Sequence, residues 1–542
     1  MKHPLLRALL LAFVAAGCET PGPGTAVARS QTRVAPSCAS LDEAPLRTGL
    51  GIDDIACVAV GAAHAEGTDE WPDATAAAEP VAYVRPGAAP GGDGARARPF
   101  ATIAQALDAP RRPRTLLLAR GRHPAPGVAL TADAALVGRG ADVTTLFGTA
   151  AAPVLRVAGA ATRVALTALA VRHEGPAPAP AEASLVEVAE GALALREVSL
   201  DGGYDVLRAR DAVVEGEGVT VRRGLHHGVF AVGRGRVALT RFDIRDNGAQ
   251  GVRLEGPHAV LSRGQVADNA RHGVVLMGSV DGVSGRARCF GENGGGGRDC
   301  VERVTFLRNG VAGLFVEGTR TLEARRILAA GTRLADVGGG AAGDGLVVGA
   351  AATVVLDDDL TDVARRGFGS AFVDNARVGV LAQGVGASVS VRGALVAANR
   401  AGGVLLAASA AAPVIGESLL EANALGGIVV TPGATVGIVQ CNGIAETRIG
   451  TIATTAGTVS MADGIHVNGG RGEPRFVDNE VSGSARFGLL VNASRATLID
   501  NRGVANLYGV GAYGDAVIVG DRASIVGRAT APTATPPLLA GL

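Results

Sequence analysis

A short phrase that returns along the chain constrains the fold more than any other feature of the sequence. It consists of an asparagine, three variable residues and a glycine, and in its most regular stretches it recurs every 22 to 24 residues or so. Its six clearest copies are Asn247–Gly251, Asn269–Gly273, Asn309–Gly313, Asn375–Gly379, Asn399–Gly403 and Asn423–Gly427. A repeat of about this length indicates a solenoid, in which each unit packs mainly on its two neighbours.

The residues after each glycine predict one short β-strand per unit. Val252-Arg253-Leu254 and Val274-Val275-Leu276 place apolar residues at alternate positions, so their first and third side chains face one side. Strands this far apart are expected to coil round and lie parallel, about 4.8 Å from one another. The asparagines would then stack into ladders, and the glycine is expected to admit the tight bend that enters the strand.

This pattern resembles the right-handed parallel β-helix of the pectin-lyase-like superfamily over residues 81–525. The resemblance implies an all-β chain that forms a single-stranded right-handed solenoid. The segment from Pro99 to Leu107 resembles the opening of many such proteins, where a short helix caps the first coil. Ile103, Ala106 and Leu107 would share one face of that helix. Residues 526–542 are rich in proline, threonine and alanine and are expected to form a C-terminal tail.

The N-terminus has the composition of a signal peptide over residues 1–18, with Lys2 and Arg7 before an apolar run. The end of that run, Val14-Ala15-Ala16-Gly17-Cys18, resembles the cleavage box of bacterial lipoproteins, although Ala15 stands where leucine is usual. The resemblance implies that Cys18 is lipidated and that the chain is anchored at the outer membrane or cell surface. An ordinary secreted protein is the alternative. Residues 19–80 are expected to form a flexible tether.

The other five cysteines predict disulfides in an oxidising, extracytoplasmic compartment. Cys38 with Cys57, and Cys289 with Cys300, are close enough in sequence to close small loops. Cys441 is left over, and we expect it to be a buried, inert thiol rather than a reactive one.

Charge and lysine content exclude several classes of function. The 51 basic and 51 acidic residues balance, so there is no electrostatic case for binding nucleic acid. Lys2 is the only lysine, which excludes a lysine Schiff base and a P-loop for nucleotide phosphates. Membrane association is expected only through the lipid at the N-terminus.

Alignment of the coils on the strand glycine predicts rows of polar side chains. The position before the glycine holds His227, Gln250 and His272 in three successive coils, and four residues further upstream Asp246 and Asp268 align. Two carboxylates on neighbouring coils could share a proton, hold a calcium ion or act on a glycosidic bond.

Arg271 could neutralise the two carboxylates. A plain alternative is that Asp246 and Asp268 are solvated turn residues, because Asp-Asn is a favourable turn dipeptide. No other metal or cofactor is expected.

A further row should face outward from the middle of each strand, and it is unusually apolar. An exposed apolar row marks a surface for a partner, unless projecting loops or the tether cover it. The residues predicted for this partner surface are Phe230, Val275, Phe315, Val347, Leu381 and Leu405.

These features favour a non-enzymatic, lipid-anchored surface protein that binds a cell-envelope polysaccharide or protein through one face. The alternative is a polysaccharide lyase, hydrolase or epimerase of the pectin-lyase-like type. The sequence lacks most of the motifs that polygalacturonases of this superfamily place in successive coils, so no catalytic residue is carried over. The ligand and the oligomeric state stay open.

Overall fold

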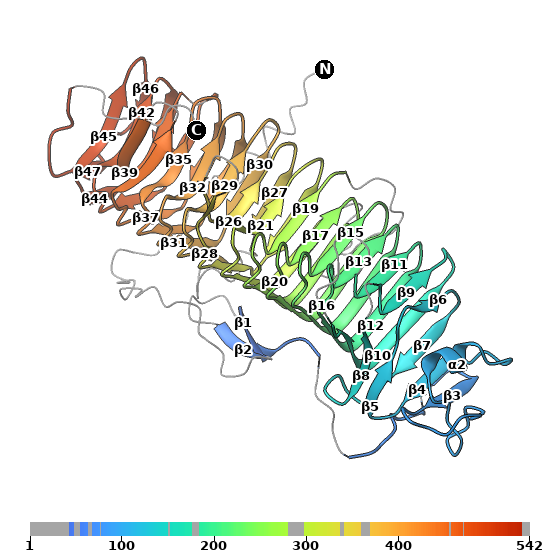
Figure 1. The fold of residues 1–542 in the computed structure, drawn as a ribbon. Helices are drawn as coiled ribbons and strands as arrows, with labels where there is room; N and C mark the ends of the chain where they lie inside the picture. The colour runs from blue at the N-terminus through green and yellow to red at the C-terminus, as the bar shows by residue number, and fades with distance from the viewer. Residues whose placement is uncertain are drawn as a thin grey trace, which may run out of the picture.

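Each repeat forms one coil of a right-handed parallel β-helix, and the coils stack along one axis into an elongated solenoid (Figure 1). The computed structural model describes residues 43–47, 55–62, 68–75, 77–149, 152–175, 184–279, 298–336, 341–358, 369–454, 457–469 and 471–533. In these ranges the strands of each coil pair in parallel with the equivalent strands of the neighbouring coils. The predicted fold class is therefore confirmed.

One strand of each coil belongs to a parallel sheet that runs along the solenoid, here called sheet I. Its strands, in order along the axis, are β6 (Val128–Leu130), β9 (Leu155–Ala158), β11 (Val186–Ala189), β13 (Leu207–Arg210), β15 (Val229–Val232), β17 (Val252–Glu255), β19 (Val274–Met277), β21 (Ala312–Val316), β26 (Asp344–Val348), β29 (Val378–Gln383), β32 (Gly402–Ala407), β35 (Leu425–Val430), β39 (Gly457–Asn468), β42 (Phe487–Asn492) and β45 (Tyr508–Tyr513).

The remaining strands of each coil close the other sides of the solenoid. In its first half these strands are β3 (Val81–Val84), β4 (Thr115–Leu118), β5 (Gly121–Pro124), β7 (Ala134–Val137), β8 (Thr144–Gly148), β10 (Arg163–His173), β12 (Ala192–Asp201), β14 (Val213–Arg222), β16 (Arg236–Arg245), β18 (His258–Ala267) and β20 (Asp299–Leu307).

In the second half they are shorter and mostly come in pairs. They are β22 (Thr321–Arg325), β23 (Leu328–Ala330), β27 (Thr353–Asp357), β28 (Ser370–Val373), β30 (Ser388–Arg392), β31 (Ala394–Ala397), β33 (Ala411–Gly416), β34 (Leu419–Glu421), β36 (Thr435–Gln440), β37 (Gly443–Ala445), β40 (Arg475–Val477), β41 (Glu480–Ser482), β43 (Arg495–Ile499), β44 (Gly503–Asn506), β46 (Val517–Gly520) and β47 (Ile525–Gly527).

A single residue in the left-handed backbone region bends the long strands from one side of the solenoid to the next. Arg241 in β16 and Arg263 in β18 have φ angles of 52° and 53°. The ladder between β14 and β16 skips this residue, since Glu217 pairs with Thr240 and pairing resumes at Val219 with Phe242. Each bend therefore works as a one-residue corner, with apolar residues facing the interior on both sides of it.

Stacked asparagines line one corner of the solenoid, as predicted. Nδ2 of Asn247 donates to Oδ1 of Asn269 at 2.9 Å, and Nδ2 of Asn269 donates to Oδ1 of Asn309 at 3.0 Å. The next coil has Thr332 at this position, and its hydroxyl donates to Oδ1 of Asn375 at 2.7 Å. The ladder continues from Asn375 through Asn399 to Asn423. A second ladder joins Asn442, Asn479 and Asn501.

The strand glycine is required for a different reason from the one expected. Gly251 does not have a positive φ angle. A Cβ atom at Gly251 would lie 2.5 Å from Val266, 2.7 Å from the Asn269 amide nitrogen and 2.8 Å from the Gly273 carbonyl oxygen. Close approach to the next coil and to the asparagine ladder, rather than a tight bend, therefore excludes a side chain here.

Described parts of the predicted tether lie along the solenoid. β1 (Glu43–Arg47) and β2 (Ile55–Ala59) form an antiparallel hairpin beside β18 and β20 (Figure 1). The Thr305 hydroxyl donates to the Pro45 carbonyl at 2.6 Å, and the Gly61 amide donates to the Arg241 carbonyl at 2.8 Å. These described pieces therefore pack on the solenoid and do not form a flexible tether. For the rest of residues 19–80, the flexible tether stays a prediction.

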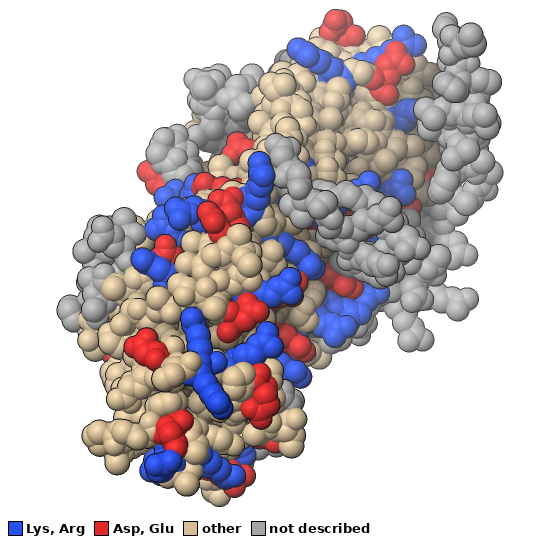
Figure 2. Space-filling model, turned by 90° about the vertical axis from the view of Figure 1, so that its right-hand side faces the viewer, with Lys and Arg blue, Asp and Glu red and all other residues tan. Residues whose placement is uncertain are grey.

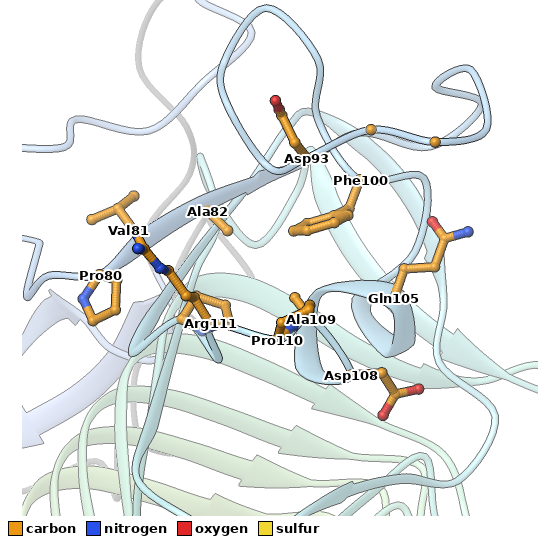
Figure 3. A pocket seen from close by; sticks show the side chains of 13 residues that line it. Pro80, Val81, Ala82, Asp93, Phe100, Gln105, Asp108, Ala109, Pro110 and Arg111 are labelled. Carbon is orange, nitrogen blue, oxygen red and sulfur yellow. The ribbon is translucent and has the colours of Figure 1, made fainter.

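The N-terminal coil carries a short helix at the predicted place. Helix α2 (Ile103–Leu107) begins after Thr102, whose hydroxyl accepts a hydrogen bond from the Gln105 amide at 3.2 Å. Ile103 and Ala106 are buried in the main core, and the role of the helix as a cap stays a prediction. A hollow of about 820 Å³ lies between the helix and β3, where Figure 3 shows Phe100 and Gln105 beside it.

Two insertions interrupt the regular coils. β24 (Ala335–Asp336) and β25 (Ala341–Ala342) form a small antiparallel pair. β38 (Gly450–Thr454) forms an antiparallel hairpin with the first part of β39. The predicted loop closed by Cys289 lies outside the described residues. No helix in the described part of the chain is long and apolar enough to cross a membrane.

The described cysteines are all bonded. Cys57, Cys300 and Cys441 are disulfide-bonded and none of them is a free thiol. Cys38 and Cys289, the predicted partners of the first two, lie outside the described residues, as does the predicted lipidation site Cys18, so these assignments stay predictions. The expectation of a free thiol at Cys441 is wrong. Its φ angle of 58° places it at a corner of the coil rather than inside it.

The described part of the predicted tail packs back on the last coils. The regular strands end at Gly527, and Ala531 then packs on a cluster of Phe487, Leu490 and Tyr513. The Tyr513 hydroxyl donates to the Pro532 carbonyl at 2.7 Å. The end of the chain up to residue 533 therefore covers the outer side of sheet I at its C-terminal end.

Candidate functional site

Polar side chains form a row just before sheet I, where the chain turns into β13, β15, β17 and β19. Asp205 and His227 lie on neighbouring coils, because the Val206 amide donates to the His227 carbonyl at 2.9 Å. The Gly228 amide donates to the Gln250 carbonyl and the Gly251 amide to the His272 carbonyl, each at 3.0 Å. The structure thus stacks His227, Gln250 and His272 as the repeat predicts and adds Asp205 at the start of the row.

A second row lies one residue earlier in the chain and is more exposed. The His226 amide donates to the Tyr204 carbonyl at 2.9 Å, and the Arg271 amide donates to the Ala249 carbonyl at 3.0 Å. Tyr204 and His226 are half-buried, whereas Arg271 is exposed. The two rows run side by side because they occupy consecutive positions of the chain in each coil.

Asp205, His226 and His227 form the tightest group in these rows. Nδ1 of His226 donates to Oδ1 of Asp205 at 3.1 Å, and the same oxygen accepts the His227 amide at 3.2 Å. The two imidazole rings are 3.6 Å apart at their centroids, and Tyr204 stacks on His226 from the other side at 4.9 Å. One carboxylate oxygen and two imidazole nitrogens of this group lie within 4.8 Å of one another.

Burial keeps two histidines of the row uncharged at neutral pH. Burial, with contributions from the neighbouring His226, Arg253, Arg271 and Arg208, lowers the pKa of His227 to about 3. Burial likewise lowers the pKa of His272 to about 4, with Arg271 and Arg253 contributing.

Three polar atoms in this row are buried without a hydrogen-bond partner: Nδ1 of His227, Oε1 of Gln250 and Nδ1 of His272. A buried polar atom left unpaired costs about 1–3 kcal/mol. Groups left unpaired in this way mark a place where a ligand, an ion or a catalytic role can explain the cost.

Arginine side chains and aromatic rings lie on the strands of sheet I that follow these polar rows. The register places Arg208, Phe230, Arg253, Val275 and Phe315 side by side on successive strands. The Arg208 guanidinium lies 5.6 Å from the centre of the Phe230 ring, and Nε of Arg253 donates to Glu255 at 2.6 Å.

The predicted carboxylate pair belongs to a different surface. Asp246 and Asp268 occupy left-handed corner positions, with φ angles of 58° and 54°. Asp268 accepts hydrogen bonds from Arg308 at 3.0 Å and Arg333 at 2.6 Å. The structure thus favours the alternative of solvated turn residues, and the partners of Asp268 are Arg308 and Arg333 rather than Arg271. Figure 2 shows a face on which acidic and basic side chains are likewise intermingled.

The predicted partner surface is not an exposed apolar row. Val275, Val347, Leu381 and Leu405 are between 2% and 5% exposed, and Phe230 and Phe315 are half-buried. Most of these residues pack in a second apolar cluster outside sheet I, to which the hairpin β38–β39 contributes Met461 and Val459. For Val275, Val347, Leu381 and Leu405 the expectation of an exposed partner surface is therefore wrong, and the alternative that other segments cover the row holds, whereas Phe230 and Phe315 stay half-buried.

Sequence reasoning missed Tyr204, Asp205 and His226. Alignment on the strand glycine omits the coil of Tyr204 and Asp205, because Val206 stands where the later coils have glycine. His226 lies in the coil of Gly228, directly before His227, and was missed because the alignment considered only the position next to the glycine. Alignment on the apolar strand itself, Leu207 with Val229, would have placed Asp205 in the row.

A second buried group lies further along sheet I. Asp463 and His466 are fully buried, with His466 Nδ1 donating to Asp463 at 2.8 Å, and Arg486 Nε donates to Asp463 at 2.7 Å. These hydrogen bonds hold the pKa of Asp463 below its usual value despite its burial, which acts in the opposite direction. The group has no exposed member of the kind that His226 supplies in the first cluster, so a substrate has less access to it.

Several solved structures are similar to this chain at low identity. The periplasmic alginate epimerase AlgG is 11% identical over 77% of this chain and 82% of that chain, with a TM-score of 0.33. The A-module of a mannuronan C-5 epimerase from Azotobacter vinelandii is 15% identical over 75% of this chain and 91% of that chain, with a TM-score of 0.28.

The catalytic domain of a GH87 alpha-1,3-glucanase is 10% identical over 78% of this chain, with a TM-score of 0.29, and this chain spans 64% of that domain, less than two thirds. No model of a known protein family matches the chain, and no curated protein matches it. Because one fold carries many activities, these similarities carry no argument about the reaction.

Proposed function

We propose that the protein is a carbohydrate-active β-helix protein that binds an acidic polysaccharide across strands β13–β21 of sheet I and acts on it at Asp205, His226 and His227. The observation that carries this proposal is the row of buried, unpaired polar atoms beside that cluster. Such atoms are stabilised when a polar ligand supplies their missing hydrogen bonds.

The surroundings of the cluster favour an anionic sugar. Arg208, Arg253 and Arg271 act electrostatically on His227, so their positive charges meet at one place on the surface. Arginine recognises carboxylates through paired hydrogen bonds. The half-buried ring of Phe230 lies between Arg208 and Arg253 on successive strands, and the half-buried ring of Phe315 lies two strands beyond Arg253. A polymer of uronic acids presents both carboxylates and apolar ring faces, so it fits this surface better than a neutral polysaccharide does.

The groups present favour proton transfer over hydrolysis. Hydrolysis of a glycosidic bond uses two carboxyl groups roughly 5–10 Å apart. Here Asp205 is the carboxylate of the cluster, and Glu255 is already engaged by Arg253. An arginine that binds the sugar carboxylate makes the neighbouring C–H bond more acidic, and Tyr204 or His226 can move that proton. The reaction proposed is therefore that of a lyase or an epimerase.

The non-enzymatic binding function that the sequence features favour has less support than the enzymatic one. It depends on an exposed apolar surface, and most of the residues expected there are buried. We retain from it the proposal that the protein works outside the cytoplasm, anchored through a lipid on Cys18. That part depends on the lipoprotein-like cleavage box alone.

Activity against uronic-acid polymers tests the proposal. Purified protein is incubated with polymannuronate, polygalacturonate and a neutral glucan, and both unsaturated products and a change in sugar configuration are measured. We expect activity on at least one acidic polymer and none on the glucan. His226→Ala and Tyr204→Phe should each lower the rate at least about 100-fold, as loss of an acid or base does.

Asp246→Asn is the matched control, because Asp246 is exposed at another corner of the same coils. This variant should keep the wild-type rate. Equal loss of activity in Asp246→Asn and His226→Ala would contradict the placement of the active site at the Asp205, His226 and His227 cluster. Inactivity of the wild type on every acidic polymer would contradict the proposal as a whole.

A further inference from the structure

Three side chains of the cluster have the chemistry of a transition-metal site. Asp205 and His227 are each 2% exposed, and His226 is half-buried and reaches solvent. Their donor atoms lie within 4.8 Å of one another, and Oδ1 of Asp205 is 3.1 Å from Nδ1 of His226. Zinc bonds of about 2.0–2.2 Å in tetrahedral geometry place neighbouring donor atoms roughly 3.3 Å apart, so small side-chain movements would complete the set.

We propose that Asp205, His226 and His227 bind one divalent transition-metal ion of the zinc class, with a fourth position open to water or to an anionic ligand. The inference builds on the proposed function, because it assigns an ion to the same cluster. Two imidazole nitrogens and one carboxylate oxygen with an open position form the ligand set of a catalytic rather than a structural zinc site.

A second observation supports the site independently of the spacing. His227 is buried and its Nδ1 atom has no hydrogen-bond partner, while its ring lies against that of His226. Buried polar side chains are normally paired, and an ion would engage this imidazole.

The donor set selects the class of ion. Calcium takes six to eight oxygen ligands in most proteins, whereas imidazole nitrogens suit zinc, cobalt, nickel and copper. The nearby arginines disfavour any cation, but Nε of Arg253 already donates to Glu255 and Arg271 is exposed to solvent. Their charge would draw an anion to the open position of the metal, which agrees with an acidic substrate.

Metal titration of the full chain tests the inference without any substrate. The protein is stripped with a chelator and titrated with Co²⁺, whose visible spectrum reports tetrahedral nitrogen and oxygen ligands, and then with Zn²⁺ in competition. We expect one equivalent to bind, Zn²⁺ to displace Co²⁺, and Ca²⁺ to leave the spectrum unchanged. Asp205→Asn and His226→Ala should each weaken binding about 100-fold or more, while His272→Ala, a histidine of the same row outside the cluster, should not change it.

Thermal unfolding shows whether each variant is folded, and Zn²⁺ should raise the Tm of the wild type and of His272→Ala but not of Asp205→Asn. If Asp205→Asn does not fold, His226→Ala and His227→Gln, which keeps a side chain of similar length, decide the result. Absence of stoichiometric binding, or equal binding in the ligand variants, overturns the inference.

The inference and the proposed function fail in different ways. Tyr204→Phe should keep metal binding and lose activity, because the phenol is outside the ligand set. Metal binding without activity on any acidic polymer contradicts the proposed function alone. Activity on an acidic polymer without any stoichiometric metal binding contradicts the inference alone.

Discussion

At the residue scale, a few buried polar side chains hold neighbouring coils in register. Each ladder asparagine uses its amide on both sides: Asn399 accepts from the amide group of Asn375 at 2.9 Å and donates to Asn423 at 2.9 Å and to the Phe372 carbonyl at 3.0 Å. Because these bonds run along the solenoid axis, one side chain joins three coils.

Removal of one ladder asparagine should therefore be costly. In Asn399→Ala, the backbone and side-chain amides of Asn375 lose Oδ1 of Asn399 as an acceptor, and the Phe372 carbonyl loses Nδ2 as a donor. Each buried group left unpaired costs about 1–3 kcal/mol. We expect the free energy of unfolding in urea to fall by about 3 kcal/mol or more. Arg400→Ala, which removes the exposed neighbouring side chain, should change it by less than about 0.5 kcal/mol. Equal effects in the two variants would contradict the structural role of the ladder.

A buried histidine should make stability depend on pH. The folded-state pKa of His272 is about 4, against an ordinary value of 6.5. Between these values the unfolded chain binds a proton that the folded chain does not, so stability falls as the pH falls from about 6.5 to about 4, by at most about 1.4 kcal/mol per pH unit.

Urea unfolding at several pH values, with chelator present, measures this dependence. His272→Gln should reduce the slope in that window and leave it unchanged above pH 7. His173→Gln serves as the control for loss of a partly exposed imidazole elsewhere on the solenoid. An unchanged slope in His272→Gln would show that the buried ring takes up a proton as readily as an exposed one.

At the element scale, one buried ion pair joins the coils on either side of the insertion between β19 and β20. The side chains of Arg320 and Asp299 are both fully buried, with 0% exposure, and Nε of Arg320 lies 2.8 Å from Oδ2 of Asp299. Arg320 also donates to the Met277 carbonyl at 2.8 Å and the Pro257 carbonyl at 2.5 Å. These contacts join β18, β19 and β20 on either side of the insertion.

Substitution of this arginine should leave the buried Asp299 carboxylate without its guanidinium partner, while the Ala259 amide still donates to it at 2.8 Å. Arg320→Met removes the guanidinium hydrogen bonds to Asp299. Breaking a buried ion pair in this way lowers the free energy of unfolding by about 3–5 kcal/mol. The double variant with Asp299→Asn should recover part of the loss, because the uncompensated charge is gone. Unfolding in urea measures both variants, and no recovery in the double variant would contradict the electrostatic explanation.

The elements that could be predicted from the sequence are those that repeat. One strand per coil, the asparagine ladders and the row of His227, Gln250 and His272 follow from a constant spacing between asparagine, glycine and apolar residues. Asp205 could not be found in that way, because Val206 replaces the glycine in its coil, and His226 lies one residue outside the aligned row. The sequence left open that other segments cover the outer row, but which segments do so could not be predicted, since it depends on contacts between segments distant in sequence, such as Met461 with the cluster outside sheet I.

At the scale of the whole molecule, the solenoid turns positions in a repeat into rows on a surface. Chemistry can then be built from residues that are about 22 apart in sequence and one strand spacing, about 4.8 Å, apart in space. The same geometry gives an extended polymer a continuous track along the axis. The central claim is that the rows beside strands β13–β21 form such a track for an acidic polysaccharide.

Binding of an acidic oligosaccharide at two salt concentrations tests this claim most directly. Wild-type protein should bind a uronic-acid oligomer but not a neutral one, and more weakly at high salt, because exposed charges are screened. Arg271→Glu, at the cluster, should weaken binding at least about tenfold, while Arg400→Glu, an equal change of charge on an exposed corner, should leave it within about twofold. Equal loss in both variants, or equal binding of neutral and acidic oligomers, would contradict the account.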